Sequence, residues 1–354
     1  MEFCFAMLYL PEAKQLRAES LMSPGRPSRA SIYERLEEAI TDLEERLGGL
    51  PVPAEAEDIW AELWHQEAHH STAIEGNTLV LAEVEKLLED GLAVGDKELK
   101  EYMEVVGYAA AAKWVYGQAR EPGDWSVDQL LTVQEVRAVH HRAMTPVWNV
   151  APHPHATPEE GPGNWRRHEI RSFPGGMKPP SFTEIDALVG DWVSEVIELM
   201  QTSETPLPER LARTHNKFER IHPFLDGNGR AGRLLLNLVL IRMGYPPAII
   251  FKSQRSRYLT AMQKADAEDF GPLGELLARA ITDNLYRFVV PAVAGPARLV
   301  PLVSLANKVN GFSAVALRNA ANRGRLRAQK SPTGTWLSSK NWVEEYGRAK
   351  FKRS

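Results

Sequence analysis

The twelve-residue stretch HPFLDGNGRAGR (222–233) places poor helix formers where a helix should begin. The apolar run Leu234–Ile241 predicts a well-formed helix, yet Gly227, Asn228 and Gly229 come just before it. Backbone N–H groups at a helix start have no partner within the helix, and the helix dipole makes that position electropositive. Because glycines let a bulky anion approach the backbone closely, we expect this turn to bind phosphates.

Charged and titratable side chains surround the same turn. Arg230 and Arg233 are three residues apart, so they share a helix face and could hold the outer phosphates. Asp226 offers a hard oxygen ligand for Mg²⁺ bridging those phosphates. His222 lies just outside the helix, where a neutral imidazole could accept a proton from an attacking hydroxyl. A glycine-rich turn alone would indicate only a capped loop, whereas the whole set predicts a nucleotide site.

The elements that must position these residues are predicted to be helices, because strand signals are few and apolar residues recur at helical spacing. The helical stretches are Ile32–Leu47, Asp58–Ile74, Leu81–Leu88, Glu98–Tyr116, Val127–Ala143, Thr183–Met200, Glu209–Arg220, Arg230–Met243, Gln254–Ala265 and Pro272–Val289. The exception is Ala151–Pro180, which is rich in Pro, Gly and His and long enough to be functional. Within it, Trp165–Phe173 is predicted to form a short β-hairpin. The expected fold class is mostly α.

Composition indicates a globular protein with more than one module. The 354 residues are 44% hydrophobic and 25% charged, and Cys4 is the single cysteine, so no intrachain disulfide can form. The apolar start of the chain lacks the basic residues of a signal peptide. The run Leu234–Ile241 is far shorter than the about 20 residues that a membrane span needs. We therefore expect a cytoplasmic protein with no membrane partner.

Charge is divided unevenly along the chain. Residues 298–354 contain 12 Lys and Arg but only two Asp and Glu, a net charge of +10, while the preceding residues carry −14. This asymmetry predicts an acidic body and a basic C-terminal module suited to a polyanion. The stretch PAVAGPARLVP (291–301) is the best linker candidate between the two.

The stretch 222–233 resembles the signature motif of Fic-domain proteins and matches it at every defining position. In that family a mostly helical domain transfers AMP from ATP to a hydroxyl side chain of a target protein. The resemblance implies that His222 is the general base and that Asp226 binds Mg²⁺. It also implies that Arg233 holds the γ-phosphate and that Arg230 assists at the phosphates. The anion hole would be formed by Gly227, Asn228 and Gly229.

Two further stretches are similar to parts of the same family. The sequence GNWR (163–166), followed by Pro179-Pro180, is similar to a flap that aligns the target segment, with Trp165 and Arg166 in it. The stretch Arg257-Tyr258-Leu259 is similar to the segment beside the adenine, which implies that Tyr258 stacks on the base. An aromatic residue at helical spacing is also suited to packing in the core. Because the signature motif does not select the base, another nucleotide or a phosphocholine donor is an alternative to ATP as the donor.

Ser71-Thr72-Ala73-Ile74-Glu75-Gly76 ends a predicted helix and resembles the inhibitory motif of the Fic family. The resemblance implies that Glu75 pairs with Arg233 and displaces the γ-phosphate, with Ser71 and Gly76 completing the motif. As an alternative, Glu75 would orient a water that removes AMP from modified targets. His65 and His69 have metal-ligand spacing on the same helix, but we interpret them as surface or packing residues.

The basic C-terminal stretch resembles a winged helix-turn-helix of the excisionase/MerR type. Leu302–Val309 and Ala314–Asn322 read as two helices joined by a turn, with Ser313 as an N-cap, and a basic hairpin follows. If this module binds DNA, Arg318 and Asn319 would reach base edges while Arg325 and Arg327 meet phosphates. A solvated helical cap is the alternative. One copy would bind weakly, so a homodimer is expected.

These interpretations divide the chain into four parts. Residues 1–120 form a helical region that carries the inhibitory helix at about 58–77, and 121–290 form the Fic core. Residues 291–301 are the linker and 302–354 the winged-helix-like module. The function predicted is an autoinhibited protein adenylyltransferase that uses ATP and Mg²⁺ on a target protein. The alternative is a DNA-binding regulator whose Fic core senses nucleotide or mediates dimerisation.

Overall fold

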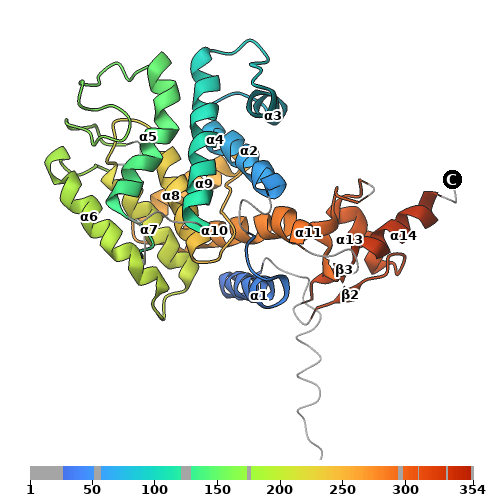
Figure 1. Cartoon of the computed structure of the whole chain (residues 1–354). Coiled ribbons are helices and arrows are strands. Elements are labelled where there is room, and N and C mark those ends of the chain that lie inside the picture. The colour runs from blue at the N-terminus through green and yellow to red at the C-terminus, as the bar shows by residue number, and fades with distance from the viewer. Residues whose placement is uncertain are drawn as a thin grey trace, which may run out of the picture.

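The computed structural model of the chain describes residues 27–51, 57–120, 129–173, 177–293, 298–309, 311–331 and 334–351. Helices dominate these residues, so the predicted mostly α fold is confirmed (Figure 1). The helices of the main body are α1 (Arg29–Leu47), α2 (Glu57–Ile74), α3 (Leu81–Asp90), α4 (Leu99–Arg120), α5 (Val133–Val150), α6 (Ile185–Val196), α7 (Leu207–Ile221), α8 (Asn228–Arg242), α9 (Arg255–Asp266) and α10 (Gly271–Asn284). Shorter helical turns are η5 (Phe182–Glu184), η6 (Ile197–Met200), η7 (Lys252–Gln254), the π-helical η8 (Leu285–Val289) and α11 (Val290–Val293).

Helix α8 lies inside the main body and fixes the position of the signature motif. Every residue from Arg230 to Ile241 is buried. Helices α2, α4, α5 and α7 all pack against α8. A helix that is buried all round is a core helix, and its sequence therefore shows no solvent-facing stripe. Because four neighbours hold α8, its N-terminal turn is presented to the surface from a rigid base.

The predicted helix Val127–Ala143 is displaced along the chain, because α5 spans Val133–Val150. The start is set by a capping box, in which the Thr132 hydroxyl accepts from the N–H of Glu135 and the Glu135 carboxylate accepts from the N–H of Thr132. The helix then continues through Pro146, beyond the predicted end. Residues 127 and 128 lie outside the described residues.

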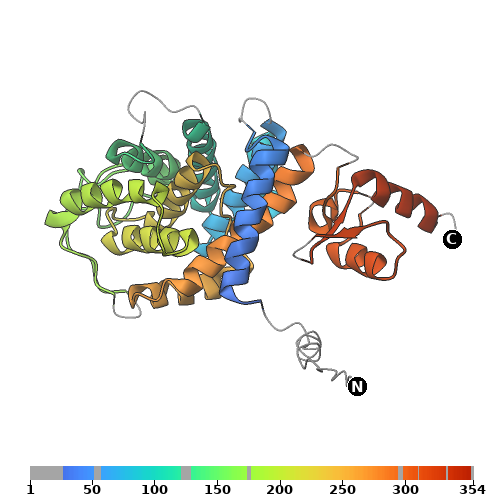
Figure 2. The same cartoon turned by 90° about the horizontal axis from the view of Figure 1, so that it is seen from below.

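The C-terminal residues form a small unit beside the main body (Figure 2). Its elements are β1 (Val300–Pro301), α12 (Leu302–Leu305), α13 (Ala314–Asn322), β2 (Gln329–Lys330), β3 (Trp336–Ser338) and α14 (Lys340–Phe351). The strands form an antiparallel sheet in the order β1-β3-β2, and Leu317, Leu326 and Val343 are buried in its core. The predicted linker is shorter than 291–301, because α11 extends to Val293 and Val300 already pairs with Ser338.

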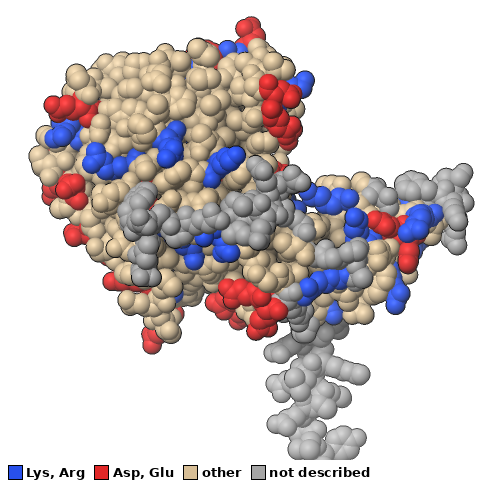
Figure 3. All heavy atoms as spheres, in the orientation of Figure 1, with Lys and Arg blue, Asp and Glu red and all other residues tan. Residues whose placement is uncertain are grey.

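In the view of Figure 3, Lys and Arg side chains are prominent on the C-terminal unit, while the main body shows Asp and Glu patches along its edges and Lys and Arg patches across its face. Within the described ranges, no helix has both the length and the apolarity that crossing a membrane would require.

Candidate active site

His222 lies at the junction between α7 and the loop that leads into α8. It has φ 50°, in the left-handed region, and its N–H donates to the Phe218 carbonyl. Nδ1 lies 3.3 Å from the carbonyl oxygen of Glu219. A carbonyl can only accept, so Nδ1 carries the proton in this contact and Nε2 is left as a proton acceptor. Burial lowers the pKa of His222 to about 4, and the ring is therefore neutral at pH 7.

The loop between His222 and α8 is closed by Asn228. Its side-chain oxygen accepts from the N–H of Phe224 at 2.9 Å, and its amide nitrogen donates to the Phe224 carbonyl at 2.8 Å. Gly227 has φ 79°, and a side chain there would collide with Met144 of α5. Asn228 therefore contributes its side chain to loop geometry, a use that the sequence alone does not indicate.

The backbone at the start of α8 is arranged as an anion-binding site requires. The first N–H bonded along the helix is that of Ala231, which donates to the Gly227 carbonyl at 2.9 Å. The N–H groups of Asn228, Gly229 and Arg230 therefore precede the helical hydrogen bonds. Together with the helix dipole, they leave this end of α8 electropositive.

Asp226 is half-exposed at the mouth of this turn. Its Oδ1 accepts from the N–H of Gly227 at 2.6 Å and lies 3.1 Å from the guanidinium of Arg230. Burial alone would raise the pKa of Asp226, but Arg230 and the Gly227 N–H outweigh it and hold that pKa below its usual value. Arg230 is itself buried, with Glu104 at 3.6 Å, and its Nε and Nη1 have no hydrogen-bond partner among the described residues.

Arg233 is occupied by the end of α2. Its Nε donates to the Ser71 hydroxyl at 2.6 Å, and its Nη2 donates to the Ser71 carbonyl at 3.0 Å and to the Glu75 carboxylate at 2.8 Å. Arg233 is 4% exposed and Glu75 is 42% exposed. Burial alone would lower the pKa of Arg233, but the nearby Glu75 outweighs it and the pKa is raised. The structure thus brings together the two stretches that the sequence associates.

The Glu75 carboxylate also covers the start of α8. A Cβ atom added to Gly229 would lie 2.5 Å from Glu75 Oε1, so only glycine permits this approach. The next residue, Gly76, has φ 110°, which allows the chain to turn sharply after α2. A carboxylate therefore rests against the turn whose free N–H groups would receive a phosphate.

Several contacts hold α2 in this position. Asn77 donates to the Glu101 carbonyl and to the Glu104 carboxylate, and Arg255 donates to the Ile74 carbonyl at 2.6 Å. Farther along α2, Glu67 is buried and accepts hydrogen bonds from Tyr108, Tyr116 and Asn237. Burial raises the pKa of Glu67, while these three hydrogen bonds lower it. The sequence gives no signal for Glu67, because its partners lie on α4 and α8.

The flap loop consists of Gly163–Phe173 and Met177–Pro180, and the predicted hairpin within it is wrong as a pair of strands. None of its described residues forms a strand, and one backbone bond joins its sides, from the Phe173 N–H to the Met177 carbonyl at 2.9 Å. Arg166 is buried instead, and donates to the carbonyls of His222, His168 and Pro180. Side-chain hydrogen bonds therefore take the place of a strand ladder.

Trp165 and His140 connect the flap loop to the motif. The Trp165 ring lies 5.0 Å from that of Phe224, and its Nε1 donates to Asp186. His140 is buried and stacks on Phe224 at 3.6 Å between ring centroids. The N–H of Gly163 donates to its Nδ1, so its Nε2 carries the proton that the Asp226 carbonyl accepts at 2.8 Å. Sequence reasoning missed this link.

Tyr258 occupies a core position rather than presenting a free ring. It is 3% exposed, and its hydroxyl lies 2.7 Å from Nε2 of His215. Burial raises the pKa of Tyr258. Of the two readings that the sequence left open for this residue, the structure favours packing in the core. Contact with the adenine remains a prediction.

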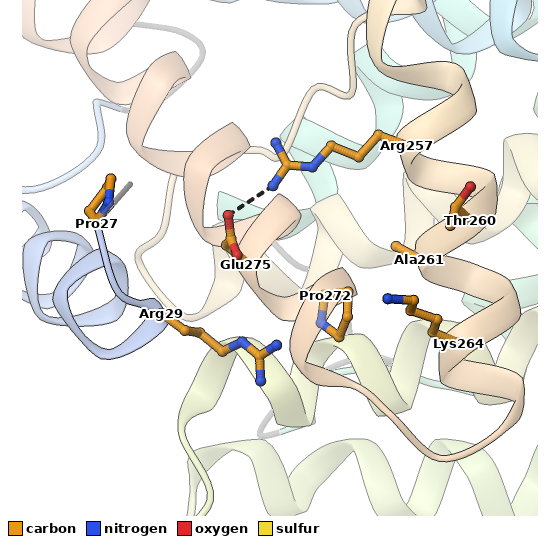
Figure 4. Close-up of a pocket in the computed structure, with 8 residues that line it drawn as sticks. All are labelled: Pro27, Arg29, Arg257, Thr260, Ala261, Lys264, Pro272 and Glu275. Atoms are coloured by element: carbon orange, nitrogen blue, oxygen red, sulfur yellow. Dashed lines mark hydrogen bonds and ion pairs between the residues drawn. The ribbon is translucent and has the colours of Figure 1, made fainter. Parts of the chain in front are cut away.

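A cavity of about 550 Å³ is lined by residues of α9, α10 and the start of α1 (Figure 4). Arg29, Arg257 and Lys264 line it, but Arg257 is bound to Glu275 at 2.8 Å and Arg29 lies 3.7 Å from Glu209. None of the motif residues lines this cavity. Arg257, however, belongs to the stretch that resembles the segment beside the adenine.

The C-terminal residues predicted to contact DNA are on the surface. Arg318 and Asn319 are exposed on α13, whose N-cap is Ser313, as predicted. Arg325 and Arg327 are exposed in the segment between α13 and β2, and Arg327 lies 4.2 Å from the Trp342 ring centroid. The structure does not bring these residues together with His222 or Arg233.

The model of the Fic/DOC family matches residues 130–240, which hold α5, α6, α7 and the motif. The similarity to this family is therefore found in the part of the chain that contains the loop and the turn described above.

Comparison with known proteins gives relatives of the same kind. The protein adenylyltransferase Fic of Aedes aegypti is 32% identical over 245 residues, which are 69% of this chain and 45% of that protein. That of Drosophila melanogaster is 33% identical over 217 residues, 61% of this chain and 40% of that protein. The chain thus spans less than half the length of these curated relatives. A solved fragment of Fic-1 from C. elegans aligns at 25% identity with a TM-score of 0.59, covering 78% of this chain and 76% of the fragment.

Proposed function

We propose that the protein is a protein adenylyltransferase that transfers AMP from ATP to a hydroxyl side chain of a target protein and releases pyrophosphate. One observation carries the proposal: the neutral His222 and the N–H groups at the start of α8 that make no helical hydrogen bond lie at the two ends of the same short loop. The curated relatives named protein adenylyltransferase support the same activity.

The reaction requires few groups from the protein. A target hydroxyl would attack the α-phosphorus as Nε2 of His222 accepts its proton, and the bond from that phosphorus to pyrophosphate would break. The N–H groups of α8, with Arg230 and Arg233, would hold the phosphates. Catalysis would consist mainly of positioning and of charge stabilisation, because no covalent intermediate with the protein is needed.

Asp226 fits a ligand for nucleotide-bound Mg²⁺. Within the described ranges no three His, Cys, Asp or Glu side chains gather as a metal site. Mg²⁺ at a nucleotide, however, takes only one or two carboxylates, and its other ligands are waters and phosphate oxygens. The Asp226 side chain is 43% exposed, so its carboxylate is accessible from the mouth of the turn. Mg²⁺ bound there would neutralise charge on the phosphates.

The proposal includes autoinhibition by Glu75. Its carboxylate takes the Arg233 guanidinium that the γ-phosphate would need, and it rests against Gly229. The Arg233 guanidinium is buried and would be left without its carboxylate partner, so release would require movement of the end of α2 that lets the phosphate replace Glu75. Once displaced, Glu75 could instead orient a water for removal of AMP from a modified target.

The Glu75→Gly variant tests this proposal. We expect it to raise AMP transfer, including transfer to the protein itself, because Arg233 becomes available to ATP. The readout is the mass added to the protein on incubation with ATP and Mg²⁺. Glu204→Gly, which removes an exposed carboxylate from the loop before α7, is the matched control and should change nothing. Equal labelling of all three proteins would refute the inhibition, and no labelling at all would count against the transferase.

DNA binding by the C-terminal unit is a second candidate function. It is supported by the net charge of +10 over residues 298–354 and by the exposed face of α13 beside a two-stranded hairpin, β2–β3. A helix followed by a hairpin wing is a common way to enter the major groove and contact the flanking phosphates. A homodimer would raise the affinity by joining two such units.

A further inference from the structure

A groove of about 690 Å³ runs beside the flap loop, along α6 and α7, to the loop before α10. Its lining mixes apolar and charged side chains. The apolar residues are Pro180, Leu188, Ile221 and Phe270. An exposed recess of this size with an apolar floor can accept side chains of a partner segment.

The charged residues of the groove are mainly cationic. Four basic side chains line it, Lys178, Arg213, Lys217 and Arg220, against two carboxylates, Glu195 and Glu268. Lys217 is bound to Glu195 at 2.5 Å. The Arg213 guanidinium lies 5.0 Å from the Phe270 ring centroid, and neither Arg213 nor Arg220 forms an ion pair within the described residues. The groove therefore offers uncompensated positive charge around an apolar floor.

The groove adjoins the candidate active site along the chain. Ile221, in its wall, is followed directly by His222. Pro180, at its other side, accepts from Arg166, the same guanidinium that donates to the His222 carbonyl. A segment seated in the groove would thus pass close to the base that receives the hydroxyl proton.

We propose that this groove docks an acidic, partly apolar segment of the target protein next to the hydroxyl that is modified. The inference rests on the proposed transferase function and specifies its substrate class. Carboxylates of the segment would meet Arg213 and Arg220, and an apolar side chain would pack on Leu188 and Phe270. The apolar floor and the two carboxylates in the lining suit a peptide better than the uniform negative charge of a nucleic acid.

A binding measurement without ATP tests the groove independently of catalysis. The probe is a fluorescein-labelled peptide with a central threonine flanked by Asp, Glu and Leu, and its control carries Asn and Gln in place of the acids. Fluorescence anisotropy with the full chain should show tighter binding of the acidic peptide. The Arg213→Ala/Arg220→Ala variant should weaken it by roughly five- to tenfold, since each exposed charge pair contributes modestly. Arg35→Ala/Arg323→Ala removes two exposed arginines elsewhere and should leave binding unchanged.

The outcomes separate the two proposals. Equal binding of both peptides, or equal weakening by the two double variants, would overturn the groove as an acidic-segment site. If the Arg213→Ala/Arg220→Ala variant loses more affinity for a labelled single-stranded oligonucleotide than for the acidic peptide, the groove is a nucleic-acid site. That result would also overturn the docking inference. Self-modification of the Glu75→Gly form is measured in parallel. If it persists while peptide preference is absent, the transferase stands and the docking inference fails.

Discussion

The protonation state of His222 has a measurable consequence. Because burial lowers its pKa to about 4, about 90% of the imidazole stays neutral at pH 5, whereas a side chain with the ordinary pKa would be almost fully protonated. We expect AMP transfer by the Glu75→Gly form, at saturating ATP and Mg²⁺, to persist as the pH falls from 7 to 5. The measurement is the rate of AMP incorporation across that range.

His222→Ala in the same background is the control for this pH profile. Loss of a general base lowers a rate by roughly 10²–10⁴, so little transfer should remain at any pH. An inflection near pH 6.5 in the rate profile of the Glu75→Gly form would show that His222 titrates like a solvated imidazole. Undiminished transfer by His222→Ala would remove the residue from the mechanism altogether.

The candidate catalytic and phosphate-binding residues can be recognised in the sequence because they are close together. The residues that position them are far apart in the sequence and cannot be recognised in this way. Asp226, Arg230 and Arg233 lie within eight positions of one turn, so spacing alone associates them. His140 contacts the Asp226 carbonyl from 86 positions away, and a single buried histidine on a helix gives no signal of such a link. The contacts of Ser71 and Glu75 with Arg233 span 162 and 158 positions, and only the family resemblance predicts them.

At the level of elements, the proposed autoinhibition depends on how firmly α2 is docked. Glu67 joins α2 to Tyr108 and Tyr116 of α4 and to Asn237 of α8. Glu67→Ala would leave those three buried groups without their acceptor, and we expect the free energy of unfolding to fall by about 2–5 kcal/mol. A loosened α2 should also release Arg233 part of the time, so basal AMP transfer should rise.

The comparison for Glu67→Ala is Glu62→Ala on the same helix, where the carboxylate is exposed and its one ion-pair partner among the described residues is Lys308. Denaturant unfolding gives the stability and AMP incorporation gives the activity. If Glu67→Ala lowers stability without raising AMP transfer, the contacts of Ser71 and Glu75 at the end of α2 persist without the contacts of Glu67 in its middle. That result would contradict the view that the whole helix acts as one inhibitory element.

Helical periodicity predicts elements well here, but it does not place every boundary. Most predicted stretches overlap their helices closely, because a buried face repeats every three to four residues. Helix α5 starts later than expected because the Thr132–Glu135 capping box fixes it, and the sequence analysis did not use that signal. The described residues of the flap loop form no strands, and the Arg166 guanidinium instead joins its two sides through the carbonyls of His168 and Pro180, a contact that the sequence does not indicate.

For the whole molecule, buried histidines should make stability depend on pH. Burial lowers the pKa of His140 and His215 to about 3 and of His222 to about 4. Below pH 6.5 the unfolded chain binds protons at these sites that the folded protein does not, so stability falls as the pH drops, by up to about 1.4 kcal/mol per pH unit for each histidine. Glu219, whose pKa burial raises to about 8, opposes this partly.

We therefore expect a lower free energy of unfolding at pH 5 than at pH 7, measured by denaturant titration at both pH values. His215→Gln should reduce the difference, because one of the buried sites is removed. His155→Gln, at an exposed position, should leave the difference as it is. Identical stability of the parent protein at both pH values would show that the buried histidines are not neutral in the folded state.

The separation of charge within the molecule determines how the C-terminal unit should bind DNA. The chain is acidic overall, yet residues 298–354 carry +10. At physiological salt the Debye length is about 8 Å, so acidic groups farther than this from the C-terminal arginines reduce their field only slightly. We expect the full chain to bind a labelled duplex with an affinity that falls linearly with salt on logarithmic axes. Arg325→Ala should lower the slope by about 1, the amount expected for one lost phosphate contact.

Lys86→Ala is the matched control, because it removes an exposed cation from α3 in the main body. Its slope should equal that of the parent protein. If both variants lower the slope equally, the duplex interacts with the surface as a whole and not with the C-terminal unit. A slope that changes only with Arg325 would locate the contact beside α13, where the exposed Arg318 and Asn319 could then read base edges.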